Sequence, residues 1–133
     1  MSLRARVTFS IDEASRTLVF RYIGDLTGDQ LYAQIIEHIQ TVEAPWLYDF
    51  LVDARRLEGV IQASDTEAFG RWWAEYAQGN DAGRRIAVVS SDPLIHARKS
   101  LRDAIFPHRT SGVFDTMDEA QDWLAAASPE AAA

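Results

Sequence analysis

Two kinds of hydrophobic spacing alternate along the chain. Residues 3–11 carry apolar side chains at every second position, which is the period of a β-strand with one exposed face. Residues 16–23 form a second strand after the polar turn DEAS, which is too short for a parallel crossover, so we expect an antiparallel hairpin. Residues 47–54 and 85–89 are almost continuously apolar, as in interior strands buried on both faces, and 112–114 is a shorter edge strand.

Four further segments show the 3.6-residue spacing of helices, and each follows a residue suited to begin one. These residues are Thr27, Ser64, Asp92 and Thr116. Their side chains can accept hydrogen bonds from the free N–H groups of a first helical turn. The two threonines and the serine also have Gln or Glu three positions on, the capping-box pattern, so we expect Ser64 to be an N-cap. We expect the first helix to continue until Pro45 stops it and the third to be one continuous helix.

The elements therefore follow one another in the order ββαβαβαβα. Strands that alternate with helices favour parallel pairing through right-handed crossovers, with the hairpin added at the start. We predict an α/β fold with a single open, mixed five-stranded sheet and helices packed against it. A chain of 133 residues suits one domain, which we expect to span residues 1–127, with 128–133 as a frayed tail.

Composition narrows the classes of partner. The formal net charge of −7 disfavours nucleic acid and anionic membrane surfaces, because both bind through a basic surface. The chain has no cysteine, so disulfide and thiol chemistry are excluded. No segment approaches the roughly 18 apolar residues that span a bilayer, and no signal peptide follows Met1. We expect a cytoplasmic protein without integral membrane association.

Candidate binding residues gather where the parallel strands end. Ligands of open α/β sheets bind beyond the carboxyl ends of these strands, and we expect the strand at 47–54 to stop on an acid and two arginines there. The predicted ligand-binding rim comprises Asp53, Arg55, Arg56, Ser90, Ser91, His96, Arg98 and Trp72. A simpler interpretation is that the acid is satisfied by nearby N–H groups and that the other polar residues are helix caps.

Two features of the predicted helices have two interpretations each. Arg98, Lys99 and Arg102 either converge on an anionic head group or form a solvated helix face that balances an acidic chain. Trp72 and Trp73 are about 100° apart on a helix, so they cannot both face the core centre. One of them lines a pocket or a dimer surface, or the helix has a wide buried face.

Catalytic and metal-binding patterns are absent from the sequence. Asp53 at a strand end resembles the phospho-acceptor of receiver domains, but the further acids and the lysine of that site are missing. His38, His96 and His108 lie on separate elements without metal-ligand spacing. We therefore expect no enzymatic activity, no cofactor and no metal. An enzyme that uses perturbed acids at the strand edge is the remaining alternative.

Three segments resemble the SpoIIAA-like family of the STAS superfamily, which is related in fold to anti-sigma-factor antagonists and is sometimes described as STAS/Sec14-like. They are FLVDARRLEG at 50–59, RRIAVVSSDPL at 84–94 and VFDTMDEAQDWLA at 113–125, within a likeness that extends over about residues 3–127. The resemblance implies an open sheet and a regulatory or small-ligand-binding role without catalysis. The Sec14-like comparison implies an apolar ligand such as a lipid tail.

The first functional prediction is accordingly a non-enzymatic SpoIIAA-like domain. We expect it to bind a protein partner or a small anionic or lipid-like ligand, and to form a homodimer. The alternative is a phosphorylation-regulated module that resembles an anti-sigma-factor antagonist, with Ser64 as its phosphosite. Antagonists carry the serine in an Asp-Ser-Ser-Gly-like turn, whereas here the segment VIQASDT at 60–66 has no such glycine.

Overall fold

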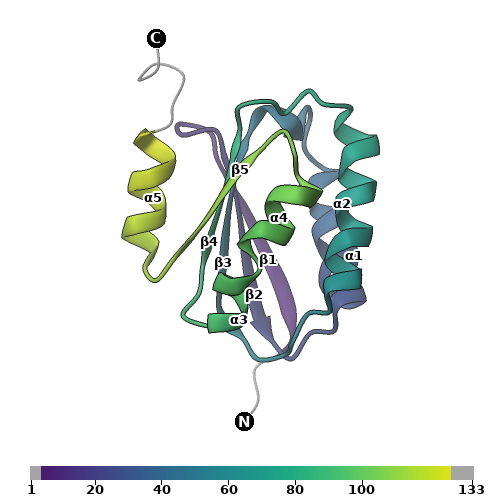
Figure 1. The fold of residues 1–133 in the computed structure, drawn as a ribbon. Helices are drawn as coiled ribbons and strands as arrows, with labels where there is room; N and C mark the ends of the chain where they lie inside the picture. The colour runs from purple at the N-terminus through teal and green to yellow at the C-terminus, as the bar shows by residue number, and fades with distance from the viewer. Residues whose placement is uncertain (1–3, 127–133) are drawn as a thin grey trace.

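A single five-stranded sheet runs through the computed structural model, which describes residues 4–126 (Figure 1). Its strands are β1 (Arg6–Asp12), β2 (Thr17–Gly24), β3 (Asp49–Leu57), β4 (Arg85–Val89) and β5 (Thr110–Phe114). They lie side by side in chain order; β1 and β2 pair antiparallel, and all later pairs are parallel. The predicted hairpin and mixed sheet are confirmed. The predicted tail at 128–133 lies outside the described residues.

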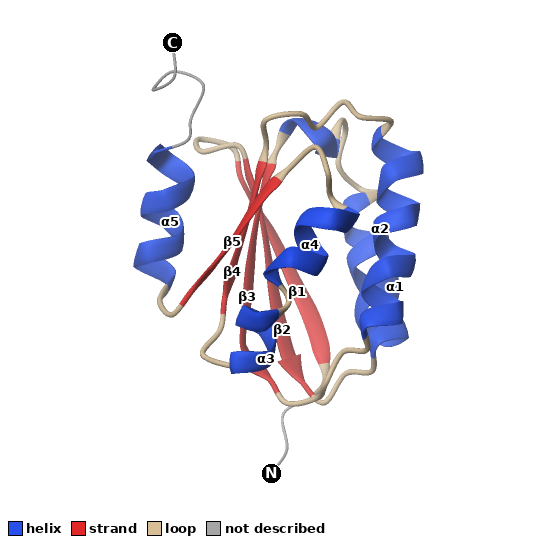
Figure 2. Cartoon of the chain, viewed as in Figure 1, coloured by secondary structure: helices blue, strands red, loops and turns tan. Residues whose placement is uncertain are grey.

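The helices divide unequally between the two faces of the sheet. They are α1 (Gly28–Ile39), α2 (Ala63–Ala77), α3 (Pro93–Ala97), α4 (Lys99–Ile105) and α5 (Met117–Ala126). Figures 1 and 2 show α1, α2 and α4 on one face and α5 on the other. Each parallel strand is added beside the previous one in the same direction, so right-handed crossovers put every connecting helix on one face. No strand follows α5 within residues 4–126, so it is not a crossover and covers the opposite face.

Strand β3 is the centre of the sheet and is buried on both faces, as its apolar run predicts. Phe50 and Val52 belong to the large core beneath α1 and α2, whereas Leu51 packs with Leu124 of α5. Asp53 follows the same alternation as Leu51 and lies on the α5 side. The strand therefore separates a large core from a small one.

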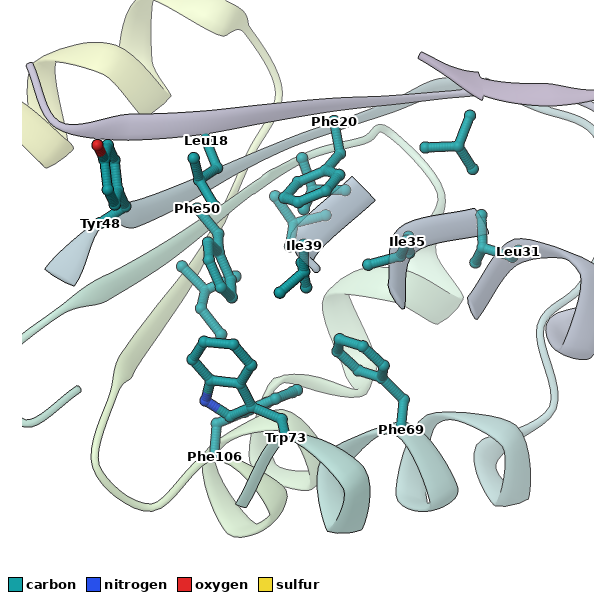
Figure 3. Packing of buried hydrophobic residues seen from close by; sticks show 14 of the residues in the cluster. Leu18, Phe20, Leu31, Ile35, Ile39, Tyr48, Phe50, Phe69, Trp73 and Phe106 are labelled. Carbon is teal, nitrogen blue, oxygen red and sulfur yellow. The ribbon is translucent and has the colours of Figure 1, made fainter. Parts of the chain in front are cut away.

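Aromatic side chains fill much of the large core (Figure 3). The ring of Phe50 meets Phe20 edge-on at 5.8 Å and Trp73 at 5.2 Å between ring centroids, geometries that aromatic pairs favour. Trp73 is 2% exposed and is the tryptophan of α2 that faces the core centre, whereas Trp72 is only partly buried. The helix thus presents a wide apolar face to the sheet.

The expected limits of two segments are wrong. The first helix ends at Ile39, where the Thr41 hydroxyl donates to the His38 carbonyl at 2.6 Å, and a short 3₁₀ helix (η1, Pro45–Leu47) precedes β3. Strand β3 does not stop at Asp53 but continues to Leu57, and its last residues pair with β2 after a register shift that leaves one extra residue in β3 between Asp53 and Arg56. Asp53 is therefore a mid-strand residue.

The starts of two helices also differ from expectation. Ser64 is not an N-cap, because α2 begins at Ala63 and the Gln62 carbonyl accepts the first helical hydrogen bonds. The predicted third helix is broken at Arg98 into α3 and α4. The carbonyl of Ile95 accepts the Arg98 N–H and the guanidinium of Arg102 instead of a continuing helical N–H. The caps at Thr27 and Asp92 are confirmed.

Candidate functional site

A cavity of about 120 Å³ lies inside the large core, between the sheet and the helices α1 to α4. Strands β2, β3 and β4 form its floor, α1 and α2 two of its walls, and the α3–α4 segment the remaining wall. Figure 3 shows Phe20 and Phe50 facing Phe69 and Phe106 across this interior. The surrounding side chains are mostly aliphatic or aromatic, among them Leu31, Ile35, Val52, Ile86, Val88 and Leu101.

The volume of this cavity is large for an interior that is otherwise close-packed. Protein cores have few voids larger than a water molecule. Apolar cavities of about 150 Å³ bind benzene. The cavity is therefore of the size that holds one small apolar group.

A close approach between helices shapes one wall of the cavity. Gly70 of α2 lies against Ile105 of α4, and a Cβ atom at Gly70 would stand 2.9 Å from the Ile105 side chain. Real Cβ contacts are essentially never that short, so the glycine permits α4 to pack directly on α2. Phe69 beside it points inward and stacks on Tyr32 of α1 at 4.8 Å between ring centroids. The absence of a side chain at one position thus brings the helical walls together.

Five polar side chains interrupt the apolar lining: Tyr22, Tyr32, Thr66, Arg98 and Arg102. The hydroxyls of Tyr32 and Thr66 are hydrogen-bonded to each other at 2.9 Å. Tyr22 makes no side-chain hydrogen bond to any described residue. Burial raises the pKa of Tyr22 and of Tyr32 above the usual value for tyrosine, so both phenols remain protonated donors at neutral pH.

The two arginines of the cavity lack carboxylate partners among residues 4–126. Arg98 donates through Nη1 to the carbonyl of Ile61, and Arg102 donates through Nη2 to the carbonyl of Ile95 at 2.7 Å. The Nε of Arg102 is buried and has no hydrogen-bond partner in the described structure. Burial lowers the pKa of Arg102, while Tyr32 and the charge of Asp103 act in the opposite direction. This guanidinium has therefore lost hydration without gaining an anion.

Asp103, which follows Arg102 in the sequence, is bonded to other groups. Asp103 accepts from Lys99 at 2.8 Å and from the Ser111 hydroxyl at 2.7 Å. These bonds hold the pKa of Asp103 below its usual value, the Lys99 bond being the larger cause. Of the three basic residues predicted to act together, Lys99 therefore pairs with Asp103 at the surface, and only Arg98 and Arg102 line the cavity.

The residues of the predicted rim lie in separate parts of the structure. Arg55, Ser90 and Ser91 do come together and line a polar pocket of about 150 Å³ at the carboxyl ends of β3 and β4. Arg55, however, donates to Asp53 through Nε at 2.9 Å and Nη2 at 2.8 Å, a bidentate pair. Arg21 approaches the same carboxylate at 3.7 Å. The hydrogen bond from Arg55 holds the pKa of Asp53 below its usual value, so the acid stays charged and occupied.

The remaining rim residues occupy other places. His96 lies at the strand edge, with Nε2 2.7 Å from the Ser90 carbonyl and 3.5 Å from Asp115. Trp72 is stacked on Tyr76 at 4.8 Å between ring centroids and lines none of the described pockets. Arg56 is exposed, as is Ser64 in the first turn of α2. The eight predicted residues therefore do not form one site.

Sequence reasoning missed the tyrosines of the cavity and placed Arg102 only in a basic group. A signal for Tyr22 was present, because it is two residues from Phe20 in β2 and therefore faces the same side of the sheet. The buried ion pair of Arg109 and Asp81, at 2.7 Å, was missed entirely. Neither of its members lies near the other in sequence, so no local pattern predicts it.

A membrane-spanning helix and a metal-binding cluster are both absent from residues 4–126. No helix in this part of the chain is long and apolar enough to cross a membrane. The same residues contain no group of three or more histidine and acidic side chains arranged to hold a metal ion.

A sequentially ordered mixed sheet with its crossover helices on one face and the last helix on the other makes this an α/β domain. The chain belongs to the SpoIIAA-like family, whose model matches residues 17–125. The resemblance in the strand and helix segments is thereby confirmed, and the match supports a regulatory domain.

Comparison with solved structures gives the same fold. The chain is similar to an uncharacterised protein with a SpoIIAA-like fold from Shewanella loihica PV-4, with 18% identity, a TM-score of 0.62 and coverage of 93% of this chain and 98% of that one. The anti-sigma factor antagonist SpoIIAA in its unphosphorylated form is also similar, with 17% identity, a TM-score of 0.48 and coverage of 90% and 97%. Comparison with curated proteins gave no match.

Proposed function

We propose that this chain is a non-enzymatic regulatory domain that binds a small apolar ligand in the cavity between its sheet and the helices α1 to α4. The observation that carries the proposal is the cavity itself, about 120 Å³ lined by mostly apolar side chains. Filling it with a ligand would recover dispersion contacts that an empty space forfeits. The family match to a regulatory type of domain supports the same role.

The experiment uses toluene as a neutral probe of the right size. Thermal unfolding of the purified protein is measured with and without toluene, and we expect the ligand to raise the midpoint in proportion to its occupancy. Native mass spectrometry of the same sample would show any small molecule that co-purifies. Unchanged thermal midpoints with toluene, together with a bare protein mass, would contradict the proposal.

The matched control fills the cavity from within. Ala54 of β3 lines it and is 5% exposed, so Ala54→Ile places added methyl groups in the space that toluene would take. We expect the variant to unfold at a higher temperature without ligand and to respond less to toluene. An equal toluene response in both proteins would place the binding elsewhere.

The second candidate function is a phosphorylation-regulated module with a protein partner. The observation that favours it is the exposed hydroxyl of Ser64 in the first turn of a 15-residue helix, where the helix dipole stabilises a phosphate. Because Ser64 does not cap α2, Ser64→Ala should change stability by less than about 0.5 kcal/mol. Under this candidate the variant loses kinase-dependent exchange of the partner, which pull-down with and without kinase measures.

A homodimer and a cytoplasmic location also belong to the proposal. Analytical ultracentrifugation tests the first: a single species at the monomer mass of 14.9 kDa over a wide concentration range would contradict it. Cell fractionation tests the second.

A further inference from the structure

We propose that the ligand is a small apolar monocarboxylate, an aryl or short alkyl acid, whose carboxylate pairs with Arg102 at the α3–α4 wall of the cavity. The inference rests on the proposed function and adds to it the charge and chemical class of the ligand. It is carried by the juxtaposition of an apolar cavity with a guanidinium that the described chain leaves without an anion.

The distribution of charge around the cavity is the first argument. The chain has 20 acidic residues and 13 lysines and arginines, so carboxylates outnumber the basic groups that could pair with them. Arg98 and Arg102 nevertheless stand four residues apart with no carboxylate within 4 Å in the described structure. Like charges at this spacing repel each other, and partial burial strengthens the repulsion. An anion between them would reverse the sign of this interaction.

The free hydrogen-bond donors form the second argument. Arg102 has a buried Nε–H with no partner, and the protonated phenol of Tyr22 also lines the cavity. A guanidinium presents a planar set of donors that matches the two oxygens of a carboxylate. Arg55 shows this geometry in the same molecule, with Nε and Nη2 on the two oxygens of Asp53. At Arg102 the Nη2 already donates to the Ile95 carbonyl, so a ligand carboxylate would first accept from the free Nε.

Size and charge together select the class of acid. The cavity is close in volume to the space of about 150 Å³ that holds benzene, so the apolar part is a single ring or a short chain. A phosphate dianion has no apolar part to contact the mostly aliphatic and aromatic lining. A neutral ligand would leave Arg102 without its anion. A monocarboxylate of the size of benzoate fits the volume of the cavity, contacts its apolar lining and supplies an anion to Arg102.

The test compares benzoate with benzamide and toluene, which share its ring and lack its charge. Isothermal titration of the full chain should give benzoate an affinity at least about tenfold above that of benzamide. Benzoate and toluene should compete for the same site. In Arg102→Met, benzoate should lose at least about tenfold in affinity, and its preference over benzamide should disappear.

The control substitution is Lys99→Met, on the same helix but paired with Asp103 at the surface, which should leave both ligands unaffected. Circular dichroism verifies that each variant is folded, and Arg102→Gln serves as a second variant should the methionine protein fail to fold. Equal affinities for benzoate and benzamide, or benzoate binding that survives both Arg102 substitutions, would overturn the inference. Toluene binding without a preference for benzoate would leave the proposed function standing, whereas failure of both ligands would contradict both proposals.

Discussion

Two arginines of this fold, the buried Arg109 and the partly buried Arg102, differ in their partners. Arg109 is 5% exposed, and its Nε donates to Asp81 at 2.7 Å. Its guanidinium also lies 3.9 Å from the ring centroid of Phe50, a favourable cation–π contact. Arg102 lines the cavity with one carbonyl acceptor and with no carboxylate within residues 4–126. Each arginine leaves one buried nitrogen without a hydrogen bond.

Arg109 is a structural charge paired with Asp81, whereas Arg102 has no anionic partner in the described structure. Asp81 is itself 3% exposed and also accepts from the indole N–H of Trp73 at 2.8 Å. Burial lowers the pKa of Arg109 to about 10, and Asp81 limits the shift, so the arginine remains charged at neutral pH. At Arg102 the same desolvation acts without a paired carboxylate. Substitutions at the two places should therefore have opposite signatures in stability and in binding.

The largest effect is expected where the buried pair is broken. Asp81→Ala and Arg109→Met each leave one buried charge without its partner, so we expect a loss of about 3–5 kcal/mol in the free energy of unfolding. Urea denaturation followed by circular dichroism measures it. Glu75→Ala, at an exposed position of α2, is the control and should change stability by less than about 0.5 kcal/mol. A loss below about 1 kcal/mol at either member would show that the pair is hydrated.

A smaller effect on stability, of opposite sign, is expected from filling the cavity that Arg102 lines. Ala54→Ile fills part of the cavity and should raise the free energy of unfolding by about 0.5–2 kcal/mol. The matched control is Ala87→Ile, because Ala87 is fully buried under α5 and lines none of the described pockets, so overpacking there should cost about 1–3 kcal/mol. Thermal and urea unfolding measure both. Destabilisation by both substitutions would contradict an available cavity.

The pair of Arg55 and Asp53 offers a more hydrated version of the Arg109 arrangement. Arg55 is half exposed, so we expect the pair to contribute only about 0.2–1 kcal/mol. The pKa of Asp53 is lowered in the folded state, so its stabilisation is present above the unfolded value of about 3.9 and is lost as the pH falls through the folded value. Urea midpoints between pH 7 and pH 2.5 should fall less steeply for Asp53→Asn. An unchanged slope would show that the pair does not contribute.

The smallest effect on stability is expected at Arg102 itself. In Arg102→Met the lost hydrogen bond to Ile95 and the removal of a desolvated charge act in opposite directions, so the free energy of unfolding should change by less than about 0.5 kcal/mol. Urea denaturation of this variant beside Arg109→Met measures the contrast directly. A loss as large as at Arg109 would make Arg102 a structural residue and would remove the reason for an anionic ligand.

The fold was largely predictable because its signals are local. The alternation at 3–11, the apolar run of β3 and the caps at Thr27 and Asp92 each depend on residues within a few positions of one another. Limits were missed where distant contacts decide them. The break at Arg98 depends on a guanidinium one helical turn further on, and β3 continues past Asp53 because it keeps pairing with β2 across a bulge in β3.

The candidate site was less predictable than the fold. Arg98 was named as a rim residue, yet its place in a cavity depends on how α3 and α4 pack on α2, which Gly70 permits by having no side chain. Asp53 and Arg55 were expected where the strand ends, but both lie within β3 and neutralise each other on the face opposite the cavity. A strand's alternation assigns side chains to two sides, but not to the helix that will cover each side.

By itself the sequence determined the elements, the mixed sheet and the apolar faces, because spacing and capping act within one segment. Only the tertiary structure decided which tryptophan of α2 is buried, that Arg109 meets Asp81, and that Arg102 faces a cavity without an acid. These outcomes depend on the distances between side chains that are far apart in the chain. Burial gives such distances their energetic weight, because a charge removed from water needs a partner that only the fold can bring to it.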